Sequence, residues 1–331
     1  MVVTTTQIGG RLGLVAGYPR YIRDWGSRNG LEYVPDVAAG YGIGVAQSAY
    51  LDLSAADNEQ EKANLVAAAV RGNVLWAIVG TEALVNGKVT EGQLISHLDD
   101  VRKRLDQAGL SHIPVATAEP YGSWANAQPG GLFHRNNSGE LEHANVFKYI
   151  DVLFAHLYPF HEGTEVGVAA GKLSTMYAEV IAAVNEVVPG LPVVIGETGW
   201  PSCGLPNRGA IPSLANEEQY FRQATAWADA NAVPMFWFAG FDENWKPEGY
   251  VGVEKHFGLH YANGEPKFAI PEPTSLCLLG AGLLAMAGRR LAQTPRDMLR
   301  DYRTRRCVPK TPSGACGVSD GCQRVLSAIT R

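Results

Sequence analysis

Cysteine is scarce in the first 270 residues of this 331-residue chain, where Cys203 stands alone. The other four cysteines are Cys277, Cys307, Cys316 and Cys322, at irregular spacing near the C-terminus. An odd number of cysteines at such spacing argues against a dense disulfide framework, and the chain has no CxxC pair that would indicate zinc. We therefore predict no metal site, and because no motif suggests a cofactor we predict none.

The sequence also lacks a strong excess of charge, since its net charge is −5 and its isoelectric point is near 5.9. Nothing in that balance suggests nucleic acid as a partner. The amino end, MVVTTTQIGG, has neither a basic segment nor a long apolar run, so no secretory signal is visible there. With 46% hydrophobic residues the chain can bury a large core, as one large domain or two small ones. We expect a monomer.

Residues 271–290, PEPTSLCLLGAGLLAMAGRR, combine Pro-Glu-Pro, a run of apolar and small residues, and two arginines. The run is shorter than the roughly 20 residues that a membrane-spanning helix needs, but the arginines are typical of a cytoplasmic flank. A buried core helix is the alternative interpretation. The segment resembles the PEP-CTERM sorting signal of Gram-negative bacteria. That resemblance implies recognition by an exosortase, a transient membrane anchor, and a protein exported to the cell surface or beyond.

Residues 291–331 follow this signal and are basic and rich in proline, glycine and serine. Such a composition is typical of a disordered tail rather than of a further domain. We therefore divide the chain into a domain at residues 1–270, a sorting segment at 271–290 and a tail at 291–331.

Upstream of residue 271 the chain alternates strand-like and helix-like runs. Seven strand candidates lie at residues 21–25, 43–51, 74–82, 113–120, 150–159, 192–197 and 233–241. Most are apolar throughout, which is typical of a parallel sheet covered on both faces. Helical periodicity occurs between them, for example at 90–109, with Thr90 as a predicted N-cap and Gly109 as a stop. This α/β pattern predicts a TIM (β/α)8 barrel, with a doubly wound open sheet as the alternative.

A complete barrel of this type has eight strands, and only seven can be counted here. The first predicted element is a helix at about residues 7–16, and the preceding MVVTT is short and polar for a strand. One interpretation is therefore a barrel that lacks its first strand.

Carboxylates and aromatic residues recur where the predicted strands end. They are Trp25, Glu82, Glu119, Tyr121, Trp124, His156, Tyr158, Glu197, Trp200, Trp237, Asp242, Glu243 and Trp245. In a parallel barrel the carboxyl ends of the strands meet at one mouth, which is where active sites lie. Two carboxylates facing each other there can cleave a glycosidic bond, one as acid and one as base or nucleophile. Aromatic rings can stack on the apolar faces of sugars, so the sequence predicts a carbohydrate cleft.

Four segments carry a specific resemblance: AIVGTE at 77–82, IGETGWPS at 195–202, FWFAGFDENWKP at 236–247 and GVEKHFGLHYANGEPK at 252–267. With these segments the chain resembles glycoside hydrolase family 17, the β-1,3-glucanase family. The resemblance implies that Glu197 is the nucleophile and Glu82 the acid/base. The family acts with retention, so the two carboxylates should lie about 5 Å apart. Glu82 must start protonated, and we expect its surroundings to raise its pKa.

The same resemblance implies that several residues bind the sugar. These are Thr81, Tyr121, Tyr158, Trp200, Trp237, Glu243 and Lys246. Thr81 stands where the family has an asparagine that hydrogen-bonds the sugar 2-hydroxyl, so we expect weaker stabilisation of the transition state. The expected function is cleavage of internal bonds (endo action) in β-1,3-glucan or in a related β-glucan polysaccharide or oligosaccharide. A transglucosylase using the same glutamates and a cell-surface glycan-binding protein with weakened catalysis are the alternatives.

Overall fold

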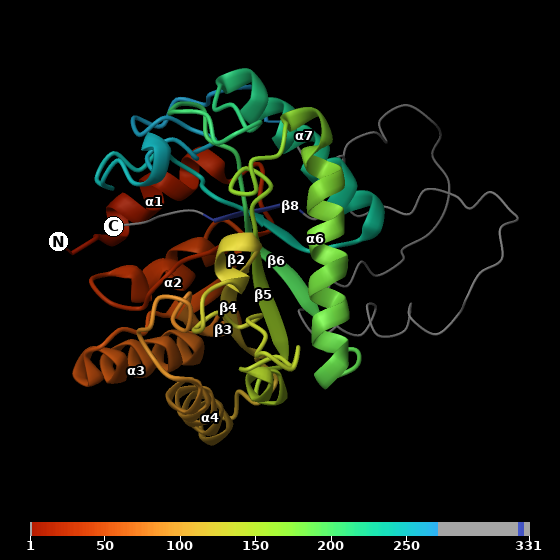
Figure 1. The fold of residues 1–331 in the computed structure, drawn as a ribbon. Coiled ribbons are helices and arrows are strands. Elements are labelled where there is room, and N and C mark those ends of the chain that lie inside the picture. Colours follow the sequence, from red (N-terminus) through yellow and green to blue (C-terminus); the bar gives the residue numbers. More distant parts are fainter. Residues whose placement is uncertain (1, 271–323, 328–331) are drawn as a thin grey trace, which may run out of the picture.

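The computed structural model describes residues 2–270 and 324–327, and Figure 1 shows helices arranged around a central set of strands. The strands are β1 (Tyr21–Arg23), β2 (Gly44–Ala49), β3 (Val74–Thr81), β4 (Val115–Tyr121), β5 (Val152–Leu157), β6 (Val193–Thr198), β7 (Met235–Trp237) and β8 (Arg324–Ser327). The α-helices are α1 (Thr5–Val15), α2 (Val34–Ala39), α3 (Ala55–Arg71), α4 (Glu91–Gln107), α5 (Ser123–Asn126), α6 (Val166–Val187) and α7 (Leu214–Asn231). Three short 3-10 helices are η1 (Leu31–Tyr33), η2 (Ala144–Lys148) and η3 (Tyr250–Gly252).

The strands form a closed barrel in the order β1 to β8, and every neighbouring pair is parallel. Seven of them, β1 to β7, agree with the seven predicted strands. The eighth position, between β7 and β1, is taken by Arg324–Ser327, a segment that we did not predict to be a strand. The gap expected from a missing first strand is therefore filled in this structure, and by residues from the other end of the chain.

Large aromatic side chains fill the barrel interior. Trp76 from β3 packs edge-on against Tyr21, Phe154 and Phe236, with ring centroids 5.3, 6.1 and 6.3 Å away. All four are buried and belong to one apolar cluster inside the barrel. The opposite faces of the strands join a second, larger core beneath the helices. Because this interior is packed, a ligand can enter only at one of the barrel's two ends.

Side-chain caps explain where several helices begin. The predicted N-cap Thr90 accepts from the Gln93 amide while the Gln93 side chain accepts from the Thr90 amide. Thr4 and Gln7 form the same reciprocal pair ahead of α1, which begins two residues before its predicted start. Such boxes satisfy amide donors that the first helical turn leaves unpaired. After α4 the chain turns through Gly109, whose positive φ of 74° is one that glycine adopts without strain.

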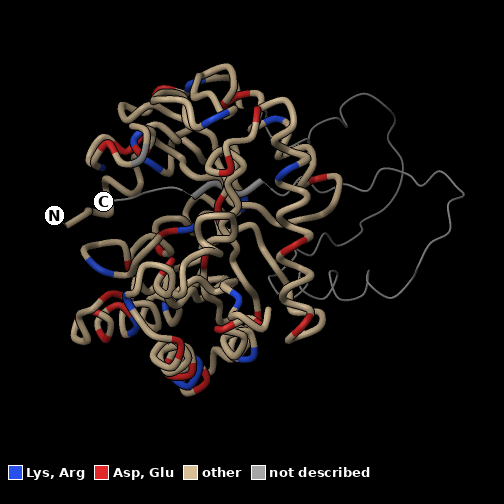
Figure 2. The backbone as a smooth tube through the Cα atoms, in the orientation of Figure 1, with Lys and Arg blue, Asp and Glu red and all other residues tan. Residues whose placement is uncertain are grey.

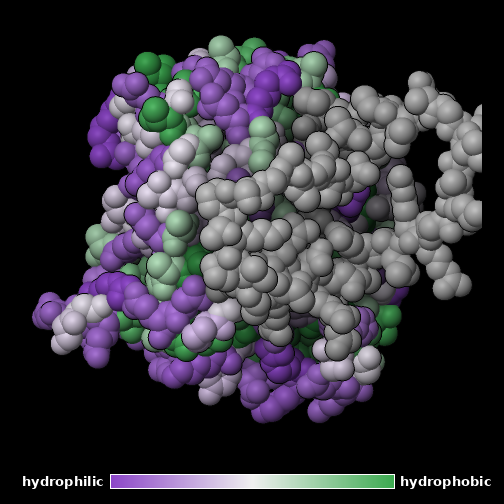
Figure 3. Space-filling view, turned by 90° about the vertical axis from the view of Figure 1, so that its right-hand side faces the viewer, coloured by the Kyte–Doolittle hydropathy of each residue, from purple (hydrophilic) through white to green (hydrophobic). Residues whose placement is uncertain are grey.

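Two predicted regions, the sorting segment at 271–290 and the tail at 291–331, lie outside the described residues apart from β8. The boundary at residue 270 therefore stays a prediction. Within residues 2–270 and 324–327, no helix is both long enough and apolar enough to cross a bilayer. Figure 2 shows acidic and basic residues interspersed along α3 and α4, and the described residues visible in Figure 3 are mostly hydrophilic with hydrophobic side chains in separate places.

A buried ion cluster fastens the last described segment of the barrel domain. The Lys267 ammonium lies 2.8 Å from Asp242 Oδ1 and 3.3 Å from Glu217 Oε2, and the lysine side chain is fully buried. It also donates to Ser202 Oγ at 2.7 Å. The cluster thus joins α7 to the loops that follow β6 and β7, which border the C-terminal mouth of the barrel.

We expect Lys267→Met to lower the free energy of unfolding by about 3–5 kcal/mol, because Asp242 would stay buried without its cation. Urea unfolding at neutral pH measures this loss. In the matched control, Lys255→Met, the lost pair is one with the exposed Glu248, so unfolding should hardly change. Equal losses in the two variants would contradict a special role for the buried cluster.

Candidate active site

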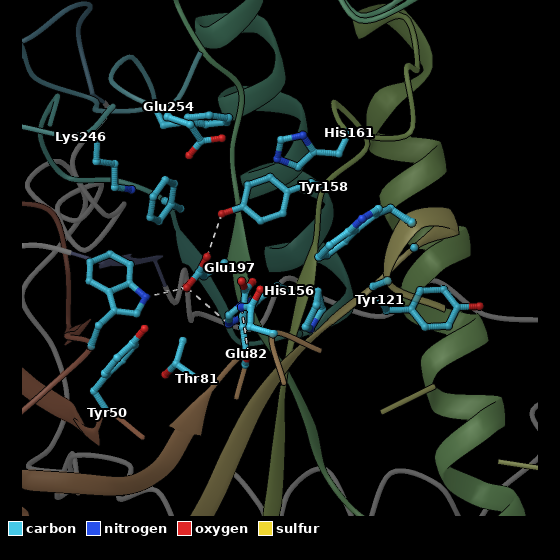
Figure 4. A pocket seen from close by; sticks show the side chains of 18 of the residues that line it. Tyr50, Thr81, Glu82, Tyr121, His156, Tyr158, His161, Glu197, Lys246 and Glu254 are labelled. Atoms are coloured by element: carbon cyan, nitrogen blue, oxygen red, sulfur yellow. Dashed lines mark hydrogen bonds and ion pairs between the residues drawn. The ribbon is translucent and has the colours of Figure 1, made fainter. Parts of the chain in front are cut away.

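A cavity of about 1050 Å³ opens at the carboxyl ends of the strands, above the aromatic interior. Six of the predicted site residues line it, namely Thr81, Glu82, Tyr121, Tyr158, Glu197 and Lys246. Figure 4 shows Glu197 and Glu82 close together in this cavity, with His156 beside Glu82 and Tyr158 reaching toward Glu197. A concave site with a few convergent polar groups is the usual setting for ligand binding.

Glu197, near the end of β6, has a carboxylate whose two oxygens are both held by donors. Oε1 accepts from Trp25 Nε1 at 2.8 Å and from Arg23 Nη1 at 3.0 Å, and Oε2 accepts from the Tyr158 hydroxyl at 2.9 Å. The side chain is almost fully buried. The following Gly199 is required by space, because a Cβ there would lie 2.2 Å from the Phe238 carbonyl oxygen. Donors and close packing therefore fix the orientation of this carboxylate.

Arg23 organises the base of the cavity, and sequence reasoning missed it. Its guanidinium is fully buried and donates to Glu197 Oε1 and Gly196 O at 3.0 Å, and to Thr81 Oγ1 at 3.2 Å. Nη1 also lies 2.8 Å from His156 Nε2. The available signal was a charged residue in the middle of the strand YIRDW, where burial is costly without partners.

Glu82 follows β3 directly and adopts a φ of +53°, a left-handed conformation that is uncommon outside glycine. Its side chain is 35% exposed, in contrast to 7% for Glu197. Oε1 of Glu82 lies 2.7 Å from His156 Nδ1. The strained backbone turns this carboxyl into the cavity instead of along the barrel wall, which is how such strain commonly serves a site.

The expectation of a raised pKa for Glu82 is wrong in this structure. Burial raises the pKa of the carboxyl, but the hydrogen bond from His156 and the nearby positive charge of Arg23 outweigh burial, so the pKa lies below its usual value. These partners favour the ionised form of a carboxyl. The sequence could not reveal this because Arg23 and His156 reach Glu82 from other strands.

One oxygen of Glu82, one of Glu197 and a ring nitrogen of His156 all lie within 4.8 Å of one another. This spacing agrees with the separation of about 5 Å expected of two carboxylates that act with retention. The same three residues could in principle ligate a cation. Arg23 and Trp25 already donate hydrogen bonds to Glu197 Oε1, and Arg23 also lies within hydrogen-bond distance of His156 Nε2. A metal bound to these atoms would have to displace a buried guanidinium. The chemistry of the site thus disfavours a metal.

The other residues predicted to bind sugar differ in position. Tyr121 lines the cavity and donates its hydroxyl to Glu179 at 3.0 Å. Lys246 also lines it, with its ammonium 4.4 Å from the centre of the Phe238 ring and 2.5 Å from Glu243 Oε2. Glu243 is buried and does not line the cavity, and burial raises its pKa to about 6. Its role is therefore to hold Lys246 and not to contact a ligand directly.

Trp200 and Trp237 do not contribute to the cavity, so their predicted contact with the sugar is wrong. Trp200 is fully buried, packs against Phe160 and Tyr220, and donates its indole N–H to Ile211 O at 3.0 Å. Trp237 lies against Tyr220 and Phe221 of α7 on the outside of the barrel. The direction of each ring depends on packing against helices. The tryptophans that line the cavity are instead Trp25, Trp124 and Trp245.

A family model described as the BtgE/BtgC glycoside hydrolase domain matches residues 4–258, which include every cavity residue named above. The chain belongs to this BtgE/BtgC family. A second model, the PEP-CTERM protein-sorting motif, matches residues 269–291 and confirms the predicted sorting signal. The chain thus contains a glycoside hydrolase domain related to β-1,3-glucanases and β-glucosidases, followed by a PEP-CTERM sorting motif.

Two curated relatives illustrate this relation. The chain is 27% identical over 229 residues to the probable beta-glucosidase btgE of Aspergillus terreus, covering 69% of this chain and 37% of the relative. It is 28% identical over 215 residues to a glucan 1,3-beta-glucosidase of Arthroderma benhamiae, covering 60% of this chain and 63% of the relative. The chain therefore spans less than two thirds of the length of either relative.

Similar solved structures confirm the barrel and not the open doubly wound sheet. One is an active-site mutant of Rhizomucor miehei beta-1,3-glucanosyltransferase in complex with laminaritriose, with a TM-score of 0.66 and 23% identity over 80% of this chain and 90% of that one. Another is an endo-laminarinase from Formosa, with a TM-score of 0.63 and 20% identity over 78% and 79% of the two chains.

The BtgE/BtgC domain also contains a buried carboxylate beneath Glu82. Glu119 on β4 accepts from the backbone amides of Leu84 and Val85 at 2.8 and 3.4 Å, and so holds the segment that follows Glu82. Burial, together with the nearby charge of Glu82, raises the pKa of Glu119 to about 8 against the opposing effect of these amides. Glu119 was noted at a strand end but was given no role from the sequence.

The Glu119 pKa predicts how stability depends on pH. Between the ordinary pKa of 4.5 and about 8, the folded state binds a proton that the unfolded state has released, so stability falls as pH rises through this range. Glu119→Gln removes that titration. We expect the melting temperature of the wild type to fall relative to Glu119→Gln between about pH 4.5 and about pH 8, and to change little above that range. The exposed-site control Glu218→Gln should follow the wild type, and a constant difference for Glu119→Gln would contradict the prediction.

Proposed function

We propose that this domain is a retaining glycosidase for β-1,3-glucan or a related β-glucan, with Glu197 as nucleophile and Glu82 as acid/base. The supporting observation is the pair of carboxylates within 4.8 Å at the base of a large cavity, in two contrasting environments. Glu197 is buried and held by donors, as an oriented nucleophile needs to be. Glu82 is more exposed and stands where a leaving group could reach it.

In the first step, Glu82 gives its proton to the glycosidic oxygen while Glu197 attacks the anomeric carbon. The glycosidic bond breaks, the leaving sugar departs with the proton, and a glycosyl ester forms on Glu197. Oε2 of Glu197 has a single donor, Tyr158, while Oε1 has both Arg23 and Trp25. Oε2 is therefore the better candidate for the attacking atom, because hydrogen-bond donors withdraw electron density from an oxygen and Oε2 has fewer of them than Oε1.

In the second step, Glu82 removes a proton from water, which attacks the same carbon and releases Glu197 as a carboxylate. Arg23 and Trp25 remain directed at Oε1 and stabilise the negative charge that returns to this oxygen. A sugar hydroxyl in place of water would give transfer instead of hydrolysis.

A long glucan is supported by the aromatic residues at the cavity rim. Trp124 follows β4 and Trp245 follows β7, and their side chains are more than half exposed although both line the cavity. These strands lie three places apart around the barrel, so a chain could extend to both sides of the glutamates and be cut internally. Together with the PEP-CTERM motif, this supports an enzyme that is exported and transiently anchored, and that acts on β-glucan at the cell surface or outside the cell.

Glu197→Ala should lower the rate on laminarin at least about 1,000-fold while the protein still binds the polysaccharide. Azide should then restore turnover of an activated aryl β-glucoside and yield an α-glucosyl azide, because it attacks from the face that Glu197 used. With Glu82→Ala the azide product should be the β-anomer. The surface variant Glu218→Gln is the control. A wild type that binds laminarin but leaves it intact would contradict the enzyme and favour glycan binding, and products longer than the input would identify transfer.

The effect of Thr81 can be tested with a matched pair of variants. Thr81→Asn keeps an acceptor for Arg23 and adds an amide donor at the cavity, so we expect kcat/KM on laminarin to rise by about tenfold. Thr81→Val has nearly the same shape as threonine but leaves Arg23 without that acceptor, and should lower kcat/KM. The hypothesis of a missing 2-hydroxyl contact fails if both variants lose activity to the same degree.

A further inference from the structure

His156 lies between the two glutamates and has no role in the steps described so far. Its ring is almost completely buried on β5, with Nδ1 2.7 Å from Glu82 Oε1 and Nε2 3.3 Å from Glu197 Oε1. Arg23 Nη1 lies 2.8 Å from the same Nε2. The two ring nitrogens therefore face different partners. Which nitrogen carries the hydrogen decides whether His156 donates a hydrogen bond to Glu82.

Arg23 determines that position. A guanidinium carries only donors, so at 2.8 Å from Arg23 Nη1 the Nε2 atom of His156 must present its lone pair. A second hydrogen on Nε2 would point at a buried cation, which is strongly unfavourable. The histidine is consequently neutral with its hydrogen on Nδ1, and this hydrogen is donated to Oε1 of Glu82.

The donation has a consequence for the protonated form of Glu82. A carboxylic acid has one oxygen that carries the proton and one that accepts. Because Oε1 already accepts from His156, the proton has to reside on Oε2. The left-handed backbone at Glu82 and the anchoring of residues 84 and 85 by Glu119 restrict movement of the carboxyl as a whole.

We propose that His156 is a positioning residue for the acid/base: held by Arg23 with its hydrogen on Nδ1, it directs the proton of Glu82 to Oε2, the oxygen that delivers it to the leaving group. This inference rests on the proposed roles of Glu82 and Glu197. The same hydrogen bond also stabilises the carboxylate that Glu82 becomes after the first step, and so favours its action as base in the second.

The proposal predicts a change in the pH profile of activity when His156 is replaced. Several other groups also influence the pKa of Glu82 and have to be considered first. The charged and titratable residues facing it are Arg23 of β1, Glu119 of β4, His156 of β5, Tyr158 and His161 of the loop after β5, Glu197 of β6 and Glu254 of the loop after β7. Among these residues, within the part of the chain that the structure describes, only His156 donates a hydrogen bond to the Glu82 carboxyl. Loss of this donor disfavours the ionised form, so the pKa of Glu82 rises and the acid form persists to higher pH.

Two variants separate the donor from the bulk of the ring. His156→Leu fills the space without a donor, while the amide nitrogen of His156→Asn can take the place of Nδ1. In a profile of kcat/KM on laminarin against pH, the decline at alkaline pH should occur about one pH unit higher in His156→Leu than in the wild type. The maximal kcat/KM of this variant should be about tenfold lower. His156→Asn should keep both close to wild type. Thermal unfolding shows that each variant is folded. An unmoved alkaline decline in His156→Leu, or equal shifts in both variants, would overturn the proposal.

A change of leaving group distinguishes positioning from damage to the cavity. A dinitrophenyl β-glucoside needs no proton in the first step, so its kcat/KM should change less than about twofold in His156→Leu. A similar loss with laminarin and with the activated glucoside would mean that the variant disturbs Glu197, against the proposal. If Glu82→Gln and Glu197→Ala keep full activity on laminarin, the proposed function itself fails. If they are inactive while His156→Leu behaves as wild type, only the inference about His156 fails.

Discussion

The site depends on a single buried guanidinium. Arg23 reaches from β1 across the bottom of the cavity to β3, β5 and β6, where Thr81, His156 and Glu197 accept its hydrogen bonds. Burying such a cation without partners would cost several kcal/mol, so the acceptors and the guanidinium require one another. Loss of any one of them would leave a charged or polar atom unpaired in a place that water hardly reaches. This mutual requirement holds Thr81, His156 and Glu197 at fixed positions around the guanidinium.

The rest of the barrel supports that arrangement from below and from the rim. Trp76 and the rings around it fill the interior, so the site lies on a packed floor and opens at the C-terminal mouth of the barrel. At the rim, the buried Lys267 cluster fastens the loops after β6 and β7, and the second of these loops carries Lys246 into the cavity. Rigid elements thus position side chains that loops alone would hold loosely.

The two glutamates differ because their surroundings differ. Glu197 lies on a strand, is almost fully buried and accepts hydrogen bonds on both oxygens. Glu82 begins a loop, and its carboxyl is hydrogen-bonded to His156 and partly exposed to the cavity. An acid/base has to exist in both protonation states during one catalytic cycle. In the proposed role of Glu82 as acid/base, a lowered pKa makes the base form easy to reach, and correct placement of the proton in the acid form then matters more.

Local patterns in the sequence determined a large part of this protein. Apolar runs located β1 to β7 and Thr90 marked the start of α4, because strand burial and capping depend on neighbouring residues. The segment IGETGWPS, through its resemblance to a known family, drew attention to Glu197, which lines the cavity. Tertiary structure alone decided the rest. Trp200 and Trp237 turned toward helices and not toward the cavity, Arg23 became the centre of the site, and the pKa of Glu82 fell below its usual value. Each of these depends on partners from distant strands, whose distances and charges no local pattern records.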